Sequence, residues 1–439
     1  MHTTKDFNST GLAKPIVIGW LLVAGFVVTC AILGDYRQHL RVFQLAWVAG
    51  AVGFGLIARS LFRGDTARSG SWSLWMVGIV AIRLALLHTV PSDDLHRYVW
   101  EGKIQRYGAN PYTTIPASTN DPLLIREDPN WPKINHPDYP AIYPPLSQLV
   151  FRLTSAFSNS VYIVKGFLVF IELLAIAVVG RLLLLLNRSP HWAALYALCP
   201  LTITSFAIDG HQDTLMLLAL AGASICGHCQ HFWKCGALIG VAISAKTVAI
   251  VLLPWLMFRR PIAVLAAIAV VVGCYLPYSD AGWHVFDSLL RFGGSTSSLG
   301  ALVTLTEPIL GDRRARMFAA LVVAVFAIYI SAKRLDLPRY ATRIFAVLFL
   351  ALPVVHAWYL TWSLFFAWSR VRVAWLMLCV TAAVYFEAES HRSQTGEWIM
   401  PTWVFAAWYG PFALALIVEY VWRKRARDRN QPYLGSDSG

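Results

Sequence analysis

The stretch "SWSLWMVGIVAIRLALLHTVPSDDLHRYVWEGKIQRYGANPY" covers residues 71–112 and changes character halfway along. Residues 71–90 are largely apolar, and a helix that crosses the hydrocarbon core of a bilayer needs about 20 such residues. Two adjacent acids, Asp93 and Asp94, follow directly, and basic and aromatic residues come after them. A loop that only joins two helices would not need paired acids at this boundary, so it is a candidate site.

The composition indicates a membrane protein. Of the 439 residues, 57% are hydrophobic and 14% are charged, whereas soluble domains carry about 25% charged residues. We expect an all-α, polytopic integral membrane protein with about 10–14 transmembrane segments and a long first outer loop that carries short juxtamembrane helices. The candidate spans are 15–33, 41–58, 71–90, 161–186, 191–208, 213–227, 235–258, 261–277, 316–332, 342–369, 373–390 and 401–421.

Basic residues are distributed unevenly between these spans. With the N-terminus inside, the inner side carries Lys5, Lys14, Arg59, Arg63, Arg68, Arg181, Arg188, Lys333, Arg334, Arg339, Arg343, Arg423, Lys424, Arg425, Arg427 and Arg429. This positive-inside pattern explains the net charge of +13 without a nucleic-acid partner. It predicts cytoplasmic termini and an outer 91–142 loop. The first span, 15–33, has no small-residue cleavage site after it and is interpreted as uncleaved.

Two candidate spans, 235–258 and 342–369, end in basic residues that a single crossing would place on the wrong side. If each span is a hairpin of two short helices, turning near 244–247 and 354–358, both of its ends stay inside. Non-helical backbone at such a depth is tolerated only beside protein or a polar cavity. We therefore favour the hairpins over single crossings and expect both turns to line a polar space.

The chain is expected to form one polytopic domain, 1–422, with an outer catalytic loop, 91–145, inside it. Residues 423–439 are basic and then polar, which predicts a disordered cytoplasmic tail.

The segment "CGHCQHFWKC" (226–235) could supply thiolate and imidazole ligands to zinc. These residues are crowded into a helix end and a short turn, so we favour a plain connection. The seven cysteines are odd in number and mostly intramembrane, which implies no disulfide framework.

Asp93 and Asp94 open a helical pattern, and acids in a first turn stabilise a helix without any catalytic role. Alternatively, a carboxylate at a low-dielectric boundary, beside a second acid, can have a raised pKa and accept a proton from a hydroxyl. Position alone leaves both interpretations open.

Charged residues within the spans are functional candidates. Arg83 could bind a lipid-linked phosphate or pair with Glu172, and Lys246 is a second candidate for the phosphate.

Two more polar groups lie near the expected outer face. Asp209, His211 and Asp213, in "FAIDGHQDTLML", could orient a substrate or form only a tight turn. His356, in "VVHAWYLTW", could serve the site or merely pack among aromatic rings.

The stretch "SDDLHRYVWEGKIQRYGANPY" (92–112), followed by "YPAIYPPLSQL" (139–149), resembles the first outer loop of GT-C superfamily glycosyltransferases. It is nearest to bacterial polyprenyl-phosphate-mannose-dependent mannosyltransferases and more distantly similar to the catalytic subunit of GPI mannosyltransferase I. The stretches "DGHQDTLMLLAL" (209–220), "AISAKTVAIVLLPWLMFRR" (242–260) and "HAWYLTW" (356–362) resemble those proteins in the same order.

The resemblance implies transfer of a sugar, mannose before glucose or aminoarabinose, from a polyprenyl-phosphate donor to a glycolipid, glycan or protein acceptor. The site would face the periplasm from a bacterial inner membrane. The family's loop acid is the general base of an inverting reaction. Aligning "LHRY" assigns this role to Asp94, with Asp93 as the second choice. Basic side chains can stabilise the departing phosphate, so no metal or cofactor is expected. Substrate-binding residues are expected to be Arg83, Arg97, Glu101, Asn110, Tyr112, Tyr143, Asp209, His211, Asp213, Lys246 and His356.

A transporter or flippase of lipid-linked sugars is the alternative, since it would also need intramembrane charges. Transporters usually carry repeats and midplane sites, whereas these polar residues crowd one face. A non-catalytic membrane partner would leave the polar residues unexplained.

Overall fold

The computed structural model describes residues 14–64, 70–126, 128–295, 299–370 and 372–428. Regular structure in these ranges is helical, apart from one isolated antiparallel bridge between Leu299 and Val354. The α-helices are α1 (Lys14–Leu33), α2 (Leu40–Phe62), α3 (Trp72–Ala85), α4 (Asp94–Arg106), α5 (Pro122–Ile125), α6 (Pro145–Phe157), α7 (Val161–Leu185), α8 (Ala194–Ala197), α9 (Pro200–Thr202), α10 (Thr214–His228), α11 (Phe232–Ala245), α12 (Leu253–Arg259), α13 (Val264–Tyr275), α14 (Asp287–Ser295), α15 (Ala301–Leu310), α16 (Asp312–Ala332), α17 (Leu337–Ala351), α18 (Leu360–Leu364), α19 (Val373–Thr381), α20 (Phe386–Thr395) and α21 (Thr402–Asp428).

The described helices confirm an all-α polytopic membrane protein. Seven helical stretches are long and apolar enough to cross a bilayer. They are Lys14–Leu33, Tyr36–Phe62, Val161–Leu185, Pro261–Phe292, Asp312–Ala332, Val373–Thr395 and Thr402–Arg425. The pair Pro190–Ala197 and Pro200–Ile208, bent by 63°, passes the same test together as one broken span. Shorter apolar helices, among them α3 and α10, fill the places of other candidate spans.

The chain reverses direction at both predicted hairpins. In the first, α11 ends before Lys246, whose backbone is extended, and a 3₁₀-helix, Thr247–Leu252, leads into α12. The chain then returns along α11, because a Cβ built on Gly236 would overlap the carbonyl oxygen of Ala263.

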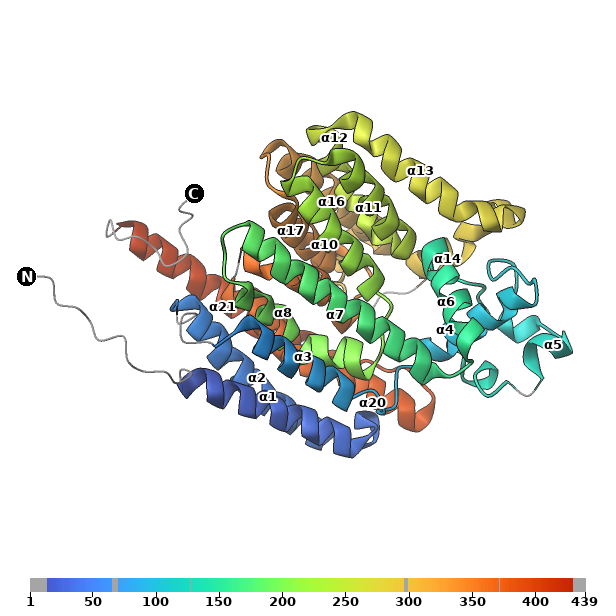
Figure 1. Ribbon diagram of the computed structural model, residues 1–439, viewed down its shortest axis with the longest axis horizontal. Coiled ribbons are helices and arrows are strands. Elements are labelled where there is room, and N and C mark those ends of the chain that lie inside the picture. The colour runs from blue at the N-terminus through green and yellow to red at the C-terminus, as the bar shows by residue number, and fades with distance from the viewer. Residues whose placement is uncertain (1–13, 65–69, 127, 296–298, 371, 429–439) are drawn as a thin grey trace, which may run out of the picture.

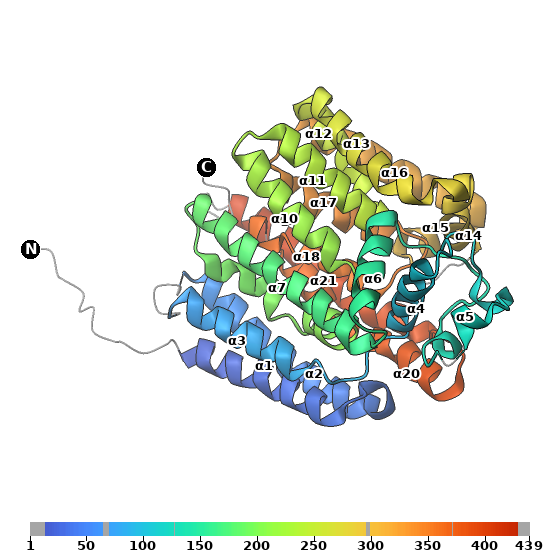
Figure 2. The same ribbon diagram turned by 45° about the vertical axis from the view of Figure 1, so that its right-hand side comes forward.

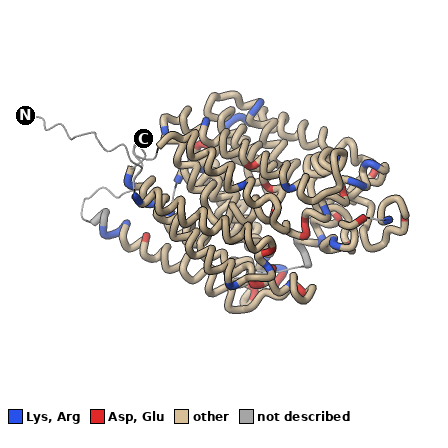
Figure 3. The backbone as a smooth tube through the Cα atoms, turned by 60° about the horizontal axis from the view of Figure 1, so that its bottom comes forward, with Lys and Arg blue, Asp and Glu red and all other residues tan. Residues whose placement is uncertain are grey.

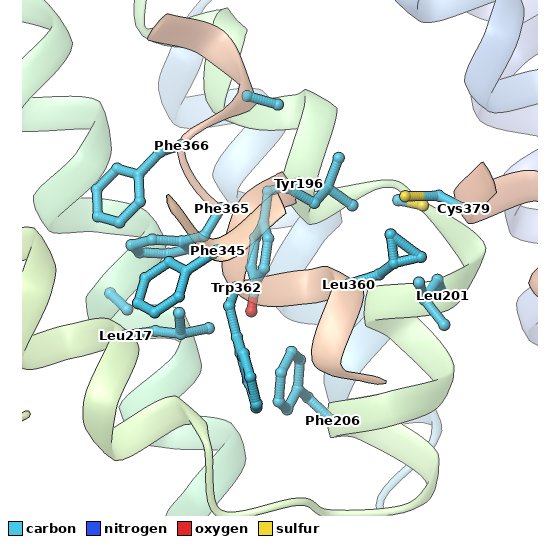
Figure 4. Packing of buried hydrophobic residues seen from close by; sticks show 14 of the residues in the cluster. Tyr196, Leu201, Phe206, Leu217, Phe345, Leu360, Trp362, Phe365, Phe366 and Cys379 are labelled. Atoms are coloured by element: carbon cyan, nitrogen blue, oxygen red, sulfur yellow. The ribbon is translucent and has the colours of Figure 1, made fainter. Parts of the chain in front are cut away.

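In the second hairpin, α17 ends at Ala351 and the short helix α18 runs back beside it. The hydroxyl of Thr342 donates to the carbonyl of Phe366 over 2.9 Å. Figure 4 shows Trp362 of α18, and Phe365 directly after it, packed against rings from neighbouring elements. The ring centroids of Trp362 and Phe345 are 6.0 Å apart, and those of Phe365 and Tyr196 are 4.9 Å apart.

The basic clusters that follow several helices meet at one end of the bundle. Arg259 donates from Nη2 to the carbonyl of Leu335 over 2.6 Å, and the Arg188 guanidinium lies over the rings of Trp192 and Trp368 at 5.6 and 5.9 Å. The segment with α4, α5 and α6 lies at the opposite end, beside α20 (Figure 1 and Figure 2). Acidic and basic segments gather together at that second end (Figure 3). The predicted separation of inner basic clusters from the 91–142 loop is therefore present in the fold.

The sequence analysis assigned no helix between 277 and 316, so the helical structure of residues 276–310 was not predicted. They form a 3₁₀-helix (Leu276–Phe286), α14 and α15. This segment lies on the outer loop, where the Tyr278 hydroxyl donates to Gln105 over 2.8 Å and the Ser288 hydroxyl to the carbonyl of Pro140 over 2.9 Å. These contacts are between distant parts of the chain, so local sequence patterns do not reveal them.

The boundary between the membrane domain and the C-terminal tail also differs from the prediction. Helix α21 continues to Asp428, so residues 423–428 are helical and not disordered as predicted. Basic residues are favourable at a helix C-terminus because they complement its dipole. Residues 429–439 lie outside the described residues, as do Lys5 and Arg68.

The cysteine segment forms a connection between α10 and α11. The amide of His231 donates to the carbonyl of Cys226 over 2.8 Å. In the described ranges, no three His, Cys, Asp or Glu side chains are grouped so that they could hold a metal ion.

Close packing of α4 on α6 predicts a sensitive glycine. A Cβ on Gly102 would overlap the carbonyl of Phe151, whereas one on Gly55 in α2 would meet nothing within 4 Å. Gly102→Ala should lower the free energy of unfolding by about 1–3 kcal/mol through overpacking, and Gly55→Ala should not lower it. Thermal unfolding in detergent checks this, and equal stability of the two variants would contradict the packing.

Candidate active site

The carboxylates of Asp93 and Asp94 are held by residues from distant segments. Asp93 precedes α4 but makes no side-chain cap bond to its first turn. Asn135 Nδ2 donates to Asp94 Oδ1 over 2.5 Å and to Asp93 Oδ1 over 3.2 Å. Arg392 of α20 pairs with Asp93 Oδ2 at 2.8 Å. On the other side, His211 Nδ1 lies 3.4 Å from Asp94 Oδ2. The acids therefore face two different partners, with one amide bridging them.

The surroundings of Asp94 favour its charged form. Burial raises the pKa of this carboxyl, but hydrogen bonds and charges from His211, and then from Asn135 and Lys246, lower it well below its usual range. Burial lowers the pKa of His211, whereas the adjacent Asp94 raises it above the usual value. The direction for Asp94 is opposite to the raised pKa that its position alone suggested, because these partners outweigh burial.

The junction between the broken span and α10 supplies the second group of side chains. Asp209 accepts a hydrogen bond from Arg37 Nη2 over 2.6 Å, and its backbone carbonyl accepts from the amide of Ser92 over 3.1 Å. Gly210 has φ +76°, a left-handed conformation that glycine adopts without strain. This turn places His211 against Asp94.

Lys246 lies at the break that follows α11. Its Nζ is 3.1 Å from Asp213 Oδ1, and the indole of Trp362 donates to the same oxygen over 2.7 Å. The ammonium also lies 5.4 Å from the ring centroid of Tyr359 and 5.8 Å from that of Trp362. Its side chain is 16% exposed and that of Asp94 is 17% exposed. Both groups remain within reach of a bound molecule.

Two imidazoles stack on one indole. The ring of Trp358 lies parallel to His211, with centroids 3.7 Å apart, and to His356, with centroids 4.3 Å apart. His356 Nδ1 is 2.7 Å from the hydroxyl of Tyr385. The "HAWYLTW" segment therefore contacts His211, the residue that faces Asp94.

The side chains of Arg97 and Glu101 are buried inside the outer loop and form hydrogen bonds within it. The buried Arg97 guanidinium donates to Glu101 over 2.8 Å and to the backbone carbonyls of residues 135, 136, 139 and 140. Glu101 also accepts from Gln148 over 2.6 Å. This network fixes the segment that carries Asn135, so Arg97 positions the acids indirectly.

The remaining predicted residues of the loop also make contacts within the protein. Asn110 donates to Asp280 over 2.7 Å, and the hydroxyl of Tyr112 donates to the carbonyl of Tyr143 over 2.8 Å. The ring of Tyr143 packs edge-on against Tyr98, whose hydroxyl donates to Asp94 over 3.4 Å. Among these three, Tyr143 is the one linked to the acids.

Arg83 is engaged elsewhere. Its Nε and Nη2 donate to the two carboxylate oxygens of Glu172 over 3.2 and 2.8 Å, and its Nη1 donates to the carbonyl of Ala197 over 2.6 Å. Both side chains of the ion pair are fully buried. This is the pairing that the sequence offered as the alternative to phosphate binding, and the phosphate role stays a prediction.

Sequence reasoning missed Asn135, Trp358, Arg392 and Arg37. A signal existed for Arg37, since an arginine between the first two spans lies on the expected outer side, against the positive-inside bias. Trp358 lies in the quoted "HAWYLTW" segment, in which only His356 was singled out, and Asn135 and Arg392 have no distinguishing local pattern.

Comparison with known protein families gives one match. Residues 12–260, more than half of the chain, match the family model described as "Alpha-(1->6)-mannopyranosyltransferase, N-terminal domain". Neither the curated proteins nor the solved structures contain a significant match.

The buried ion pair predicts a stability effect. Arg83→Met or Glu172→Met alone should each lower the free energy of unfolding by about 3–5 kcal/mol, because an uncompensated charge stays buried. The double variant should recover most of this loss. Thermal unfolding in detergent measures it. Normal stability of both single variants, with donor binding lost for Arg83→Met alone, would show that Arg83 binds phosphate.

The partners of Asp94 predict a pH effect. His211→Gln removes a cation, so burial should dominate and raise the pKa of Asp94. A base is active when ionised, and the acid limb of kcat/KM should therefore move to higher pH. His96→Gln is the matched control, since His96 bonds to Asn130 and not to Asp94. An unmoved acid limb in His211→Gln would contradict the contact.

Proposed function

The chain belongs to the alpha-(1->6)-mannopyranosyltransferase family, and from this premise we propose that it transfers mannose from a polyprenyl-phosphate donor. The acceptor is a hydroxyl of a glycolipid, glycan or protein. The observation that carries the proposal is the convergence of Asp94, His211 and Lys246, since His211 lies 3.4 Å from Asp94 and the charge of Lys246 acts on the same carboxylate. A sugar attached to a prenyl lipid has to react close to the membrane surface, because its prenyl chain stays in the bilayer.

In the proposed reaction Asp94 is the general base. It accepts the proton of the acceptor hydroxyl as the oxygen attacks the anomeric carbon of the donor. The bond from this carbon to the phosphate oxygen breaks, and its electron pair leaves with the lipid phosphate. Attack and departure on opposite faces invert the anomeric carbon. The lowered pKa of Asp94 keeps its carboxylate ionised, the form in which a general base acts.

The departing phosphate needs a cation. We assign this role to Lys246, which lies close enough for its charge to lower the pKa of Asp94. Its ammonium is shared between Asp213 and two aromatic rings, and to bind an anion it would give up part of its pairing with the buried Asp213. The indole of Trp362 continues to satisfy Asp213.

His211 has a positioning role. It holds one oxygen of Asp94 while Asn135 holds the other, so the carboxylate has a fixed orientation. As an imidazolium it also stabilises the carboxylate form between proton transfers.

The proposed orientation puts this site on the periplasmic face of a bacterial inner membrane, with both termini in the cytoplasm. The grouping of basic helix ends at the opposite end of the bundle supports it. A transporter of lipid-linked sugars is the second candidate. The ion pair of Arg83 with Glu172 does not favour it, because both side chains are fully buried and line no open path.

The decisive experiment measures transfer of label from polyprenyl-phosphate-[¹⁴C]mannose into lipid and glycan fractions of membranes that contain the protein. Asp94→Asn should lower the rate by about 10²–10⁴-fold, the usual worth of a general base. The matched Asp93→Asn variant should lose less, since Asp93 is bound to Arg392.

Each other outcome overturns a part of the proposal. Greater loss in Asp93→Asn would move the base to Asp93. Transfer from a glucosyl donor alone would replace the sugar. Binding of lipid-linked sugars without transfer from any of them would favour transport.

A further inference from the structure

A polar groove lies at the end of the bundle that carries Asp94, between the α1–α2 turn and α20. Its volume is about 510 Å³, and it is open to solvent. Its walls are Gln38, His39, Leu40, Arg41 and Val42 on one side and Glu387, Ser390, His391, Gln394 and Pro401 on the other. None of these residues has a role in the proposed chemistry.

One face of α20 supplies the second wall. Glu387, Ser390, His391 and Gln394 follow the i, i+3, i+4, i+7 spacing, which aligns side chains on one side of a helix. Arg392 points about 100° away from His391 and reaches Asp93, next to Asp94. One short helix therefore connects the groove with the acid pair.

The groove has little net charge. Arg41 pairs with Glu387 at 2.6 Å, and Gln44 donates to the same carboxylate over 3.0 Å. The remaining polar groups of the walls are amides, a hydroxyl and imidazoles. An anionic headgroup would need an excess of cations here, which the pairing of Arg41 removes. Neutral hydroxyl groups suit such a surface better.

The two glutamines lie on opposite walls. Gln38 Nε2 donates to Ser393 over 2.8 Å, and Gln394 Nε2 donates to Ser390 over 3.2 Å. Each amide keeps its carbonyl oxygen and a second N–H for a ligand, and Gln394 is exposed. Leu40, Val42 and Pro401 add apolar surface, which fits the C–H faces of pyranose rings. Alternating hydroxyl and C–H surface is characteristic of carbohydrate.

We propose that this groove is a carbohydrate subsite, which binds neutral sugar units of the acceptor away from the reacting hydroxyl. The inference rests on the proposed function, since it assumes that the acceptor hydroxyl meets Asp94. The subsite adds affinity for a chain of several sugars without touching the reacting atoms. It should therefore change KM for a long acceptor and leave kcat unchanged.

The test compares two acceptors with the full-length protein in nanodiscs: methyl mannoside and an alpha-(1->6)-linked mannotetraose. Gln38→Ala and Gln394→Ala each remove exposed amides from one wall. Each should raise KM for the tetraose up to about tenfold, the worth of one or two hydrogen bonds. KM for methyl mannoside and kcat for both acceptors should stay as in the wild type. Asn120→Ala, an exposed amide outside the groove, is the matched control and should change neither constant.

The outcomes separate this inference from the proposed function. Equal KM effects on both acceptors, or none on either, would overturn the subsite while leaving the transferase intact. Absence of transfer to either acceptor from any donor would instead refute the proposed function. Mass spectrometry of co-purified lipids covers the competing ligand: loss of a bound phospholipid from both glutamine variants, with an unchanged KM for the tetraose, would identify the groove as a lipid headgroup site.

Discussion

Backbone that leaves a helix within a bilayer must find its hydrogen-bond partners inside the protein, and this constraint decides where the site lies. Three such interruptions meet beside Asp94, and they carry His211, Lys246 and Trp358. A bundle of continuous helices would bring only side chains to this region. The interruptions add polar groups to this region, and aromatic rings pack against them, since Trp358 stacks on His211 and the rings of Tyr359 and Trp362 lie near Lys246. The site is thus a consequence of where the helices break.

Charge pairing is the second organising feature. Asp94 faces His211, Asp213 faces Lys246, and Asp93 faces Arg392. Each of these carboxylates is paired with one basic side chain. The pairing lowers the free-energy cost of keeping charges in a region of low dielectric. In the proposed reaction, the departing phosphate competes with Asp213 for the ammonium of Lys246. The Trp362 indole, which also binds Asp213, reduces the penalty of that exchange. The pairs therefore hold the charged groups in place and still allow a negative ligand to enter.

Much of the fold follows from the sequence, because hydrophobic length and the placement of basic residues are local properties. Both hairpins could be predicted, since single crossings would have put basic clusters on the wrong side. The helices between 276 and 310 could not, because they are held by contacts with the outer loop. In the candidate site, Asp94 and His211 could be selected from the sequence, because each lies in a polar segment next to an apolar one. Asn135 did not, since an asparagine in a proline-rich loop has many ordinary uses. The direction of the pKa shift of Asp94 depends on partners that only the fold brings near.

The family match ends at residue 260, yet the site does not. The matched part contains Asp94, His211 and Lys246, whereas Trp358 and Arg392 come from the remainder of the chain. Trp358 stacks on the imidazole of His211, which faces Asp94, and Arg392 binds the neighbouring Asp93. The first part supplies the groups assigned to the chemistry, and the second fixes their orientation. Because the second part also forms one wall of the polar groove, it is the part of the chain in which a change of acceptor can arise without loss of the base.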